Sequence, residues 1–250
     1  MRWLAAGFLV LAAVPARAGF IGAPDVVVYA DPSIGAALRA VGGEYRARTG
    51  VPVRVFCVAS DQLLALIARG TRTDVLVTLA PQMDRAAAGR LIDPATRTGA
   101  WRDPLVLAGR NVAPGEAPVS AAGLAGRLGA SGALAVIDPT APTSVDGPAL
   151  LARLGWTLPA MRVVGAIDGP GVAFMLSNWE ATLGVLPRSD ALADPTLTVA
   201  GGIPGDAATP LVYSAAITKN VLSRNAAAFV DFLKTPVAAA TLHAAGLEEP

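Results

Sequence analysis

Two serines occupy the same place in two successive strand-to-helix junctions, where hydroxyl groups could bind an anion. Ser33 ends the segment Tyr29-Ala30-Asp31-Pro32-Ser33, and Ser60 lies within Val58-Ala59-Ser60-Asp61-Gln62. The first turn of a helix has N–H groups without partners and the positive end of the helix dipole, so it favours an anion. Two such junctions at the same strand ends would converge on one crevice of an open sheet. Each serine could instead only cap its own helix.

Residues that would indicate an enzyme are scarce. His243 is the single histidine and Cys57 the single cysteine, so no paired base or metal-ligand cluster is indicated. Asp138, Asp146 and Asp168 could pair as carboxylates, and Asp138 or Asp168 could serve as the base of a small hydrolase or isomerase, although Asp-Pro and Asp-Gly-Pro sequences are also ordinary turns. The sequence has no nucleophile-elbow, phosphate-loop or zinc-helix motif. We therefore favour a binding protein over an enzyme, with no cofactor and no directly bound metal cation.

The elements that would position these residues alternate between strands and helices. Short β-branched runs alternate with Ala- and Leu-rich stretches of helical period, which predicts an α/β fold. Strands are expected at 25–30, 51–58, 74–78, 105–108, 134–137, 183–186, 196–199 and 211–217, and helices at 33–45, 63–68, 81–89, 147–154, 172–180, 224–233 and 237–245. The Gly- and Pro-containing segment 200–209 is expected to be a loop.

The first eighteen residues have the composition of a secretory signal peptide. Arg2 precedes an apolar run from Leu4 to Val14, and Ala16-Arg17-Ala18 supplies small residues for cleavage. We expect cleavage after Ala18, which leads to a periplasmic protein. The alternative is an uncleaved N-terminal anchor, although the run is short for a membrane-spanning helix.

The mature chain is nearly neutral. Without residues 1–18, 18 basic residues face 19 acidic ones over 232 residues, which gives no basic surface for nucleic acid or an anionic membrane. Cys57 has no partner for an intrachain disulfide, and its apolar setting predicts a small buried side chain rather than a reactive thiol. A chain of this length can form one large domain or two lobes.

In order and spacing, several segments resemble the periplasmic molybdate-binding proteins, which belong to the extracellular solute-binding proteins that serve ABC importers. The resemblance covers nearly the whole mature chain and is carried by Val28–Ser33, Val58–Ser60, Gly70–Thr78, Leu91–Arg97, Ala135–Pro139, Leu183–Val185, Ser189–Ala191 and Phe229–Pro236.

The resemblance implies a fold and a function. It implies a type II-like periplasmic-binding-protein fold with two α/β lobes, each a mostly parallel sheet flanked by helices, and a ligand cleft between them. Lobe one is then expected at 24–105 with 213–250 and lobe two at 106–212, since the chain should cross near Leu105 and Tyr213. The implied function is capture of a small oxyanion, molybdate or tungstate, by a monomer that delivers it to the permease of an ABC importer.

Carried over residue by residue, the two serine ligands of the first lobe fall on Ser33 and Ser60. The backbone donors of the second lobe fall near Thr143 and Gly169. The tyrosine that commonly donates to the oxyanion falls on Pro187, which has neither hydroxyl nor N–H. An acceptor left unpaired in a dry pocket costs about 1–3 kcal/mol, or about one to two decades in affinity.

Three charged residues stand beside these positions. Asp31 and Asp61 lie next to the two serines and would repel an anion if they faced it, while Arg188 could offer a charge-assisted donor in place of the missing tyrosine. These differences keep a second interpretation open, in which the same fold binds a different small solute.

Overall fold

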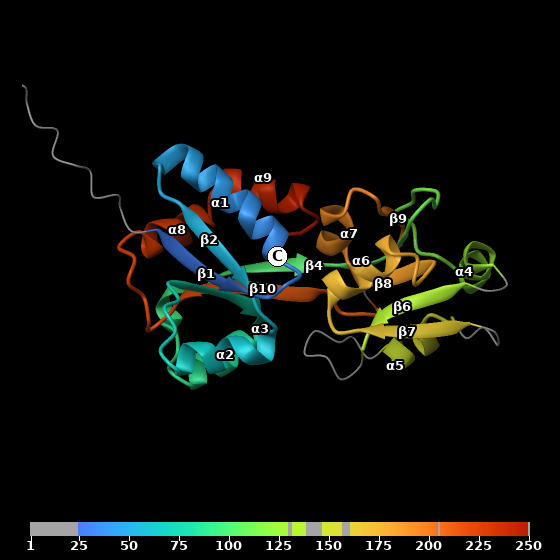
Figure 1. Cartoon of the computed structure of the whole chain (residues 1–250), viewed down its shortest axis with the longest axis horizontal. Helices are drawn as coiled ribbons and strands as arrows, with labels where there is room; N and C mark the ends of the chain where they lie inside the picture. The colour runs from blue at the N-terminus through green and yellow to red at the C-terminus, as the bar shows by residue number, and fades with distance from the viewer. Residues whose placement is uncertain (1–24, 130–131, 139–146, 157–160, 205, 250) are drawn as a thin grey trace, which may run out of the picture.

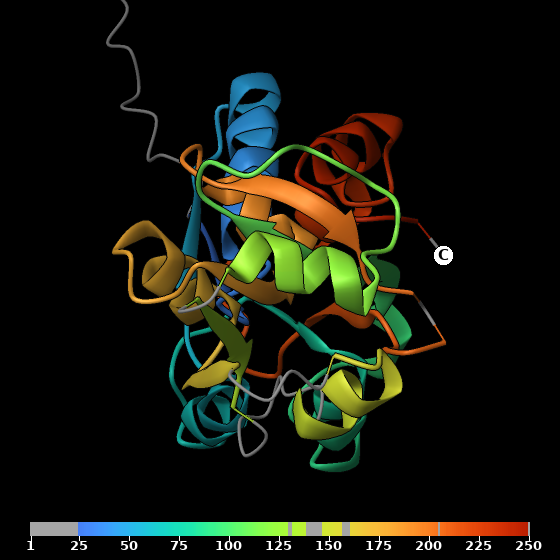
Figure 2. The ribbon, with the colours of Figure 1, turned by 90° about the vertical axis from the view of Figure 1, so that its right-hand side faces the viewer.

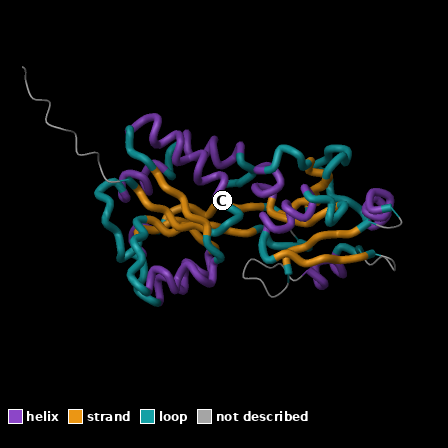
Figure 3. Tube along the Cα trace, viewed as in Figure 1, coloured by secondary structure: helices purple, strands orange, loops and turns teal. Residues whose placement is uncertain are grey.

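The computed structural model describes residues 25–129, 132–138, 147–156, 161–204 and 206–249, so the predicted signal peptide lies outside the described residues. Within this part, the chain forms two five-stranded sheets side by side along the long axis of the molecule, each with helices packed on it (Figures 1 and 3). The chain crosses from the first sheet to the second after β4 (Thr98–Asp103) and returns after β9 (Thr198–Gly202), so the second sheet is one continuous stretch, residues 105–202, whereas the first is built from two separate stretches.

The first sheet has its most apolar strands at its centre. Its order is β2 (Val53–Cys57), β1 (Val26–Ala30), β3 (Val75–Leu79), β10 (Leu211–Ile217) and β4 (Thr98–Asp103). β1 pairs in parallel with β2 and β3, whereas β10 runs antiparallel to β3 and β4. All five residues of β3 are buried, as expected for a strand covered on both faces.

Helices cover both faces of the first sheet. α1 (Gly35–Thr49), α8 (Ala226–Phe232) and α9 (Pro236–Ala244) pack on one face, and α2 (Ser60–Ala68) and α3 (Ala80–Ala88) on the other (Figure 1). A short 3₁₀ turn, Pro94–Thr96, precedes β4. α1 buries Ala37, Leu38, Val41 and Tyr45, the predicted helical face. It ends at Gly50, whose φ of 74° is the left-handed conformation that glycine tolerates best.

The second sheet repeats the strand pattern of the first. Its order is β7 (Arg162–Ala166), β6 (Ala133–Ile137), β8 (Leu183–Pro187), β5 (Leu105–Gly109) and β9 (Thr198–Gly202). β6 pairs in parallel with β7 and β8, and β5 is antiparallel to β8 and β9. Its helices are α4 (Ala121–Leu128), α5 (Gly147–Arg153), α6 (Gly169–Ser177) and α7 (Arg188–Ala193). Figure 2 views this half end on, with α4 crossing in front of the strands.

The two connections between the sheets differ in length. β4 passes into β5 through the single residue Pro104, whereas β9 reaches β10 through residues 203–210. The Arg188 backbone N–H donates to the Pro104 carbonyl oxygen at 2.8 Å, which fixes the short connection against the first turn of α7.

The predicted two-sheet α/β architecture is confirmed, but each sheet is mixed rather than mostly parallel. The reason is that the strand by which the chain enters each sheet from the other one runs antiparallel to its neighbours: β5 in the second sheet and β10 in the first. β5 begins at Leu105 and β10 at Leu211, within two residues of the lobe boundaries expected at 105 and 212; the lobe boundaries themselves stay a prediction. Within the described residues, no helix combines the length and apolar character needed to cross a membrane.

Several elements differ from the sequence-based expectation. The strands β4 and β7 and the helices α4 and α7 were not expected, and β9 extends to Gly202, into the segment predicted as a loop. β4 and β7 are both edge strands: β4 has the sequence TGAWRD, which contains no apolar run, and β7 has only a short one, with Val163 exposed.

Candidate functional site

The two predicted serines meet beside the ends of neighbouring parallel strands. β1 and β2 are in register, with Ala30 opposite Cys57, so both strands end at the same edge of the sheet. Ser33 lies three residues after Ala30 and Ser60 three residues after Cys57, and each serine is only 1% exposed. The structure therefore brings the two junctions together, as the repeated sequence pattern predicts.

Asp31 joins the two serines. Its Oδ1 accepts a hydrogen bond from the Ser33 backbone N–H at 3.2 Å, and its Oδ2 accepts one from the Ser60 hydroxyl. The Asp31 side chain is completely buried. This carboxyl, expected from the sequence to repel an anion if it faced one, thus lies inside the cluster and binds donors from both junctions.

Neither serine hydroxyl caps its helix. The N-cap residues of α1 and α2 are Ile34 and Ala59, and neither helix has a side-chain cap. The Ser60 hydroxyl donates to Asp31 and lies 3.4 Å from the Thr78 hydroxyl. The Ser33 Oγ is buried and makes no hydrogen bond with any described group. The ligand role of both serines stays a prediction, but the capping alternative does not describe either hydroxyl.

Gly169, at the start of α6, brings the second half of the molecule against Ser33. A Cβ added to Gly169 would overlap the Asp190 carboxyl and would lie 2.8 Å from the Ser33 Oγ. Only a residue without a side chain allows this close approach. Asp168 is the N-cap of α6, and its Oδ1 accepts the Gly171 backbone N–H at 2.8 Å.

The other predicted positions do not all lie in this cluster. Thr143 and the side chain of Asp61 lie outside the described residues. Pro187 ends β8, and the Arg188 guanidinium pairs with the two carboxyl oxygens of Glu116 at 2.8 and 3.2 Å. In this structure the Arg188 guanidinium contacts Glu116. Its role as a donor to the ligand in place of the missing tyrosine stays a prediction.

Four further buried polar residues belong to the cluster and were not singled out as site residues from the sequence. Asp103, Asp190 and Tyr213 are at most 5% exposed, as is Ser189, which contacts Asp103. The Ser189 backbone N–H donates to Asp103 Oδ1 at 3.1 Å, while its Oγ lies 2.5 Å from Asp103 Oδ2 and 3.0 Å from the Ser33 carbonyl oxygen. Ser189 therefore links α7 to the first junction.

The sequence held only weak signals for these residues. Asp190 lies in the Ser189–Ala191 segment that carries part of the family resemblance, but Asp103 stands before a proline and reads as a turn. Tyr213 lies within an apolar strand, where a tyrosine is an ordinary core residue. Their gathering depends on how the two sheets meet.

Burial dominates the electrostatics of the cluster. It raises the pKa of Asp31 to about 6 and that of Asp103 to about 7, and raises the pKa of Asp190 well above its ordinary value. The hydrogen bond from Ser60 lowers the pKa of Asp31, but not enough to offset burial. The pKa of Tyr213 is also well above its usual value, because of burial and then the neighbouring carboxyls.

Three polar atoms in the cluster make no hydrogen bond of good geometry with any described group, although Ser33 lies near both of the others: Ser33 Oγ, Tyr213 Oη and one carboxyl oxygen of Asp190. Buried polar groups are normally paired, so such atoms are where a ligand oxygen or hydroxyl would complete the hydrogen bonding. The cluster offers hydroxyl donors, the first turn of α6 and carboxyl acceptors, which suits a small oxygen-rich ligand.

The residues considered for catalysis or metal binding lie elsewhere or have structural contacts. Asp168 caps α6, the Asp138 backbone N–H donates to the Ala166 carbonyl at 2.7 Å, and Asp146 lies outside the described residues. Among the described residues, no three His, Cys, Asp or Glu side chains form a group suited to a metal ion. Cys57 is half-buried rather than fully buried, because β2 is an edge strand, and Arg39 Nη2 donates to its Sγ at 3.2 Å.

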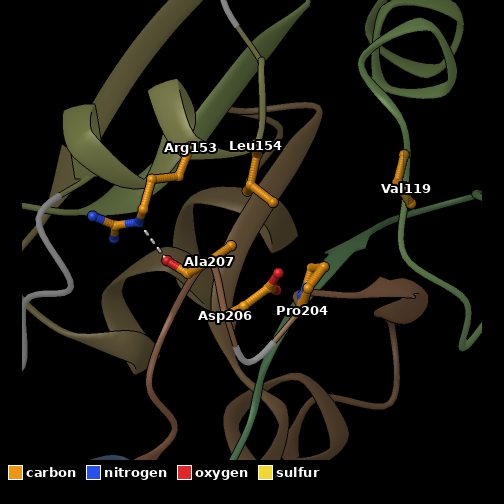
Figure 4. A pocket seen from close by; sticks show the side chains of 6 residues that line it. All are labelled: Val119, Arg153, Leu154, Pro204, Asp206 and Ala207. Carbon is orange, nitrogen blue, oxygen red and sulfur yellow. Dashed lines mark hydrogen bonds between the residues drawn. The ribbon is translucent and has the colours of Figure 1, made fainter.

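A separate cavity of about 440 Å³ lies in the second half of the molecule, between α5 and the crossing segment (Figure 4). Arg153 Nε there donates to the Ala207 carbonyl oxygen at 2.6 Å, so the main polar group of the cavity is engaged by the protein itself. None of its lining residues belongs to the serine cluster: Val119, Arg153, Leu154, Pro204, Asp206 and Ala207.

Comparison with known proteins gave one family and several relatives. The family described as bacterial extracellular solute-binding protein matches residues 26–248. The Molybdate-binding protein ModA of Escherichia coli strain K12 is 28% identical over 222 residues, which cover 86% of this chain and 85% of that protein.

Two solved structures have the same fold. The periplasmic molybdate-binding protein of Azotobacter vinelandii has a TM-score of 0.74 at 23% identity, covering 90% of this chain and 100% of that one. The substrate-binding domain of a molybdenum ABC transporter of Clostridium difficile, described as putative, has a TM-score of 0.68 at 20% identity and covers 90% and 99%.

Proposed function

The chain belongs to the bacterial extracellular solute-binding proteins, a family of binding proteins rather than enzymes, and from this premise we propose that it captures molybdate or tungstate for an ABC importer. The ligand is proposed from the Escherichia coli relative, which is a molybdate-binding protein. The permease subunits of the importer are the proposed partners. No catalytic step is part of this function.

One observation carries the proposal: the buried Ser33 hydroxyl has no partner among the described groups and faces Gly169 at the start of α6. A tetrahedral oxyanion needs several donors that converge from different directions, and helix N-termini supply such donors without a formal charge. In this proposal Ser33 and Ser60 of the first half donate hydrogen bonds to the anion, as do Gly169 and Thr143 of the second half. The two halves close over the ligand as a hinge.

Thermal unfolding of residues 19–250 tests the proposal. The thermal midpoint is measured with and without molybdate, tungstate, sulfate and phosphate, because a ligand that binds only the folded protein stabilises it by about 2.7 kcal/mol at 100 times its Kd. We expect molybdate or tungstate to raise the midpoint and Ser33→Ala to reduce that rise. No shift with any oxyanion at millimolar concentration would overturn the proposal.

Ser120→Ala is the matched control for Ser33→Ala. Ser120 caps α4, and its Oγ accepts the Gly123 backbone N–H at 3.1 Å. Its loss is expected to lower the midpoint of the unliganded protein by removing a helix cap. The rise caused by the ligand should remain, since α4 is not part of the serine cluster.

The finer aspects of export belong to the same proposal. The signal peptide is removed after Ala18, and the mature protein acts in the periplasm as a monomer. Intact-mass measurement of the exported protein gives the cleavage site, and light scattering gives its mass in solution. A mass equal to the whole chain would contradict cleavage, and a dimer mass would contradict the monomer.

A further inference from the structure

Asp31 occupies the donors that an oxyanion would need. Its two carboxyl oxygens accept the Ser33 backbone N–H at 3.2 Å and the Ser60 hydroxyl. The inference below rests on the proposed function, in which the Ser33 and Ser60 hydroxyls bind the oxyanion. A bound oxyanion must therefore share the Ser60 hydroxyl with Asp31 or displace the carboxyl from it, and when the hydroxyl is shared the anion lies against the carboxyl.

An ionised Asp31 and an unprotonated oxyanion both lack a hydrogen to share. Two acceptors in contact repel each other, and the repulsion is strong because Asp31 is completely buried. One proton placed between them converts this repulsion into a hydrogen bond of the short, charge-assisted type. The proton can come from the carboxyl or from the ligand, and the complex is the same in either case.

The surrounding charges do not neutralise Asp31. Burial raises the pKa of Asp31, and the carboxyl of Asp168 at the α6 N-cap adds to that rise. The Arg39 guanidinium of α1 donates to Cys57 Sγ at the end of β2. The titratable and charged groups around Asp31 come from both halves of the molecule: Arg39, Cys57, Asp103, Asp168, Asp190 and Tyr213. Most of these groups are acids.

Donors for the rest of the ligand are still present. Ser33 Oγ and Tyr213 Oη are each at least 99% buried and make no hydrogen bond of good geometry with a described group, although Tyr213 lies near Asp31, and Ser33 near Asp190 and Tyr213. These hydroxyls can donate to the other ligand oxygens while Asp31 remains bound to Ser60. The cluster therefore combines hydroxyl donors with carboxyl acceptors, among which Asp31 is the one bound to both serine junctions, an arrangement that fits an oxyanion carrying a hydrogen.

We propose that the site binds its oxyanion together with one proton, held between the Asp31 carboxyl and a ligand oxygen. Molybdate, tungstate and sulfate carry no proton at neutral pH, so their binding draws one from solvent. Phosphate and arsenate already carry one proton as their dianions, so their binding near pH 8 draws none. Asp31 thus favours the protonated class of oxyanion as pH rises.

The pKa of Asp31 agrees with this role. Burial raises the pKa to about 6, so the carboxyl takes up a proton at far lower cost than an exposed aspartate would. Above that pH, linkage lowers the affinity for an unprotonated oxyanion about tenfold for each pH unit. Below it, Asp31 is already protonated and the affinity no longer depends on this proton.

Titration calorimetry of residues 19–250 tests the proposal by counting protons. Molybdate and phosphate are titrated at pH 6, 7 and 8 in two buffers of different ionisation heat, and the difference in heat gives the protons taken up per ligand. We expect about one proton per molybdate at pH 8 and none per phosphate dianion. Binding of molybdate at pH 8 with no proton uptake would overturn this inference and leave the proposed function intact.

Variants assign the proton to Asp31. Asp31→Asn keeps the shape and carries a permanent hydrogen, so proton uptake should vanish and molybdate affinity at pH 8 should rise up to about a hundredfold, two units above the pKa of about 6. Asp31→Ala should also abolish the uptake. Uptake that persists in either variant would overturn the assignment.

Two controls complete the experiment. Asp231→Asn removes an exposed carboxyl that pairs with Lys234, and it should leave the proton count unchanged. Circular dichroism and the thermal midpoint establish that each variant is folded; if neither Asp31 variant folds, the proton count of the unmodified chain decides by itself. If no oxyanion binds at any pH from 6 to 8, the proposed function fails and this inference fails with it.

Discussion

Ser60 is the first residue of α2 and Gly169 is the first residue of α6, and both stand three residues beyond the end of an edge strand. β2 and β7 hold the same place in their sheets, so the two halves of the molecule present equivalent positions toward the same cluster. The first half presents a hydroxyl held by a buried carboxyl. The second half presents bare backbone at a position where a Cβ would collide with Asp190.

The two halves are therefore expected to have different roles in ligand binding. Buried side chains in the first half can change protonation and so respond to pH, whereas the backbone of α6 has fixed donors that do not titrate. A glycine in the second half also permits the close approach that brings those donors to Ser33. We expect chemical selectivity from the first half and closure from the second.

The pH dependence of stability should show the largest effect of this difference. The folded-state pKa of Asp31 is about 6, above its ordinary value of 3.8, so the folded chain holds this proton more tightly than the unfolded chain. Its contribution to stability is therefore lost as pH rises from about 4 to about 6, and amounts to about 3 kcal/mol. Asp31→Asn should remove that slope.

Urea unfolding at each pH from 4 to 8 measures this effect as the difference between the unmodified chain and Asp31→Asn. Asp231→Asn, which changes an exposed carboxyl, should follow the unmodified chain. Parallel curves for Asp31→Asn and the unmodified chain would show that the Asp31 carboxyl titrates as an ordinary exposed group.

Gly169→Ala tests the second half. The added Cβ would overlap the Asp190 carboxyl of the same half and lie 2.8 Å from Ser33 Oγ of the other, so these two side chains, or α6 itself, must shift. Overpacking of this kind costs about 1–3 kcal/mol, which corresponds to about ten- to hundredfold in ligand affinity. Calorimetry with molybdate measures it.

Gly126→Ala is the matched control, because a Cβ at that position of α4 meets nothing within 4 Å. It should keep full affinity and add a little stability, since alanine favours a helix over glycine. Equal affinities for the two variants would mean that the close approach of α6 is not needed for binding.

The two serines should differ from each other. Ser33 Oγ has no partner among the described groups, so Ser33→Ala should weaken ligand binding by about tenfold without lowering stability. Ser60→Ala leaves a carboxyl oxygen of Asp31 unpaired and should cost about 1–3 kcal/mol of stability at pH 8, where Asp31 is ionised. Urea unfolding with and without molybdate separates the two effects. A stability loss in Ser33→Ala alone would reverse the assignment.

Arg188→Ala should have the smallest effect. The guanidinium pairs with an exposed Glu116, and such surface pairs contribute about 0.2–1 kcal/mol. Molybdate affinity should stay within about twofold of the unmodified chain, on the principle that exposed charges are strongly screened. A larger loss of affinity would establish Arg188 as the donor that replaces the tyrosine missing at Pro187.

The sequence predicted the parts of the fold whose signal is local. β1, β3 and β6 are apolar runs that hold central places in their sheets, and periodic apolar residues marked the buried face of α1. The edge strand β4 was not predicted because TGAWRD contains no apolar run, and β7 was not predicted because its apolar run is limited to two valines before a glycine.

The site was predictable to the extent that it repeats along the chain. Ser33 and Ser60 could be chosen because each follows a strand by the same number of residues. The cluster of Asp31, Asp103 and Asp190 could not, since burial of a carboxyl depends on which elements pack around it rather than on its neighbours in sequence. Asp31 shows the difference most clearly, because its sequence context says nothing of its bond to Ser60.

The unequal connections between the two sheets have a consequence for chain engineering. Pro104 is the whole link between β4 and β5, and its carbonyl accepts the Arg188 N–H, so cutting or lengthening the chain there would separate two buried strand ends. The return link, residues 203–210, is longer, and its exposed residues Asp206 and Thr209 are the places to open new termini, although the two alanines between them are buried. A circular permutant opened in that link retains the Pro104 joint, and a reporter domain inserted there would sense the relative movement of the two halves.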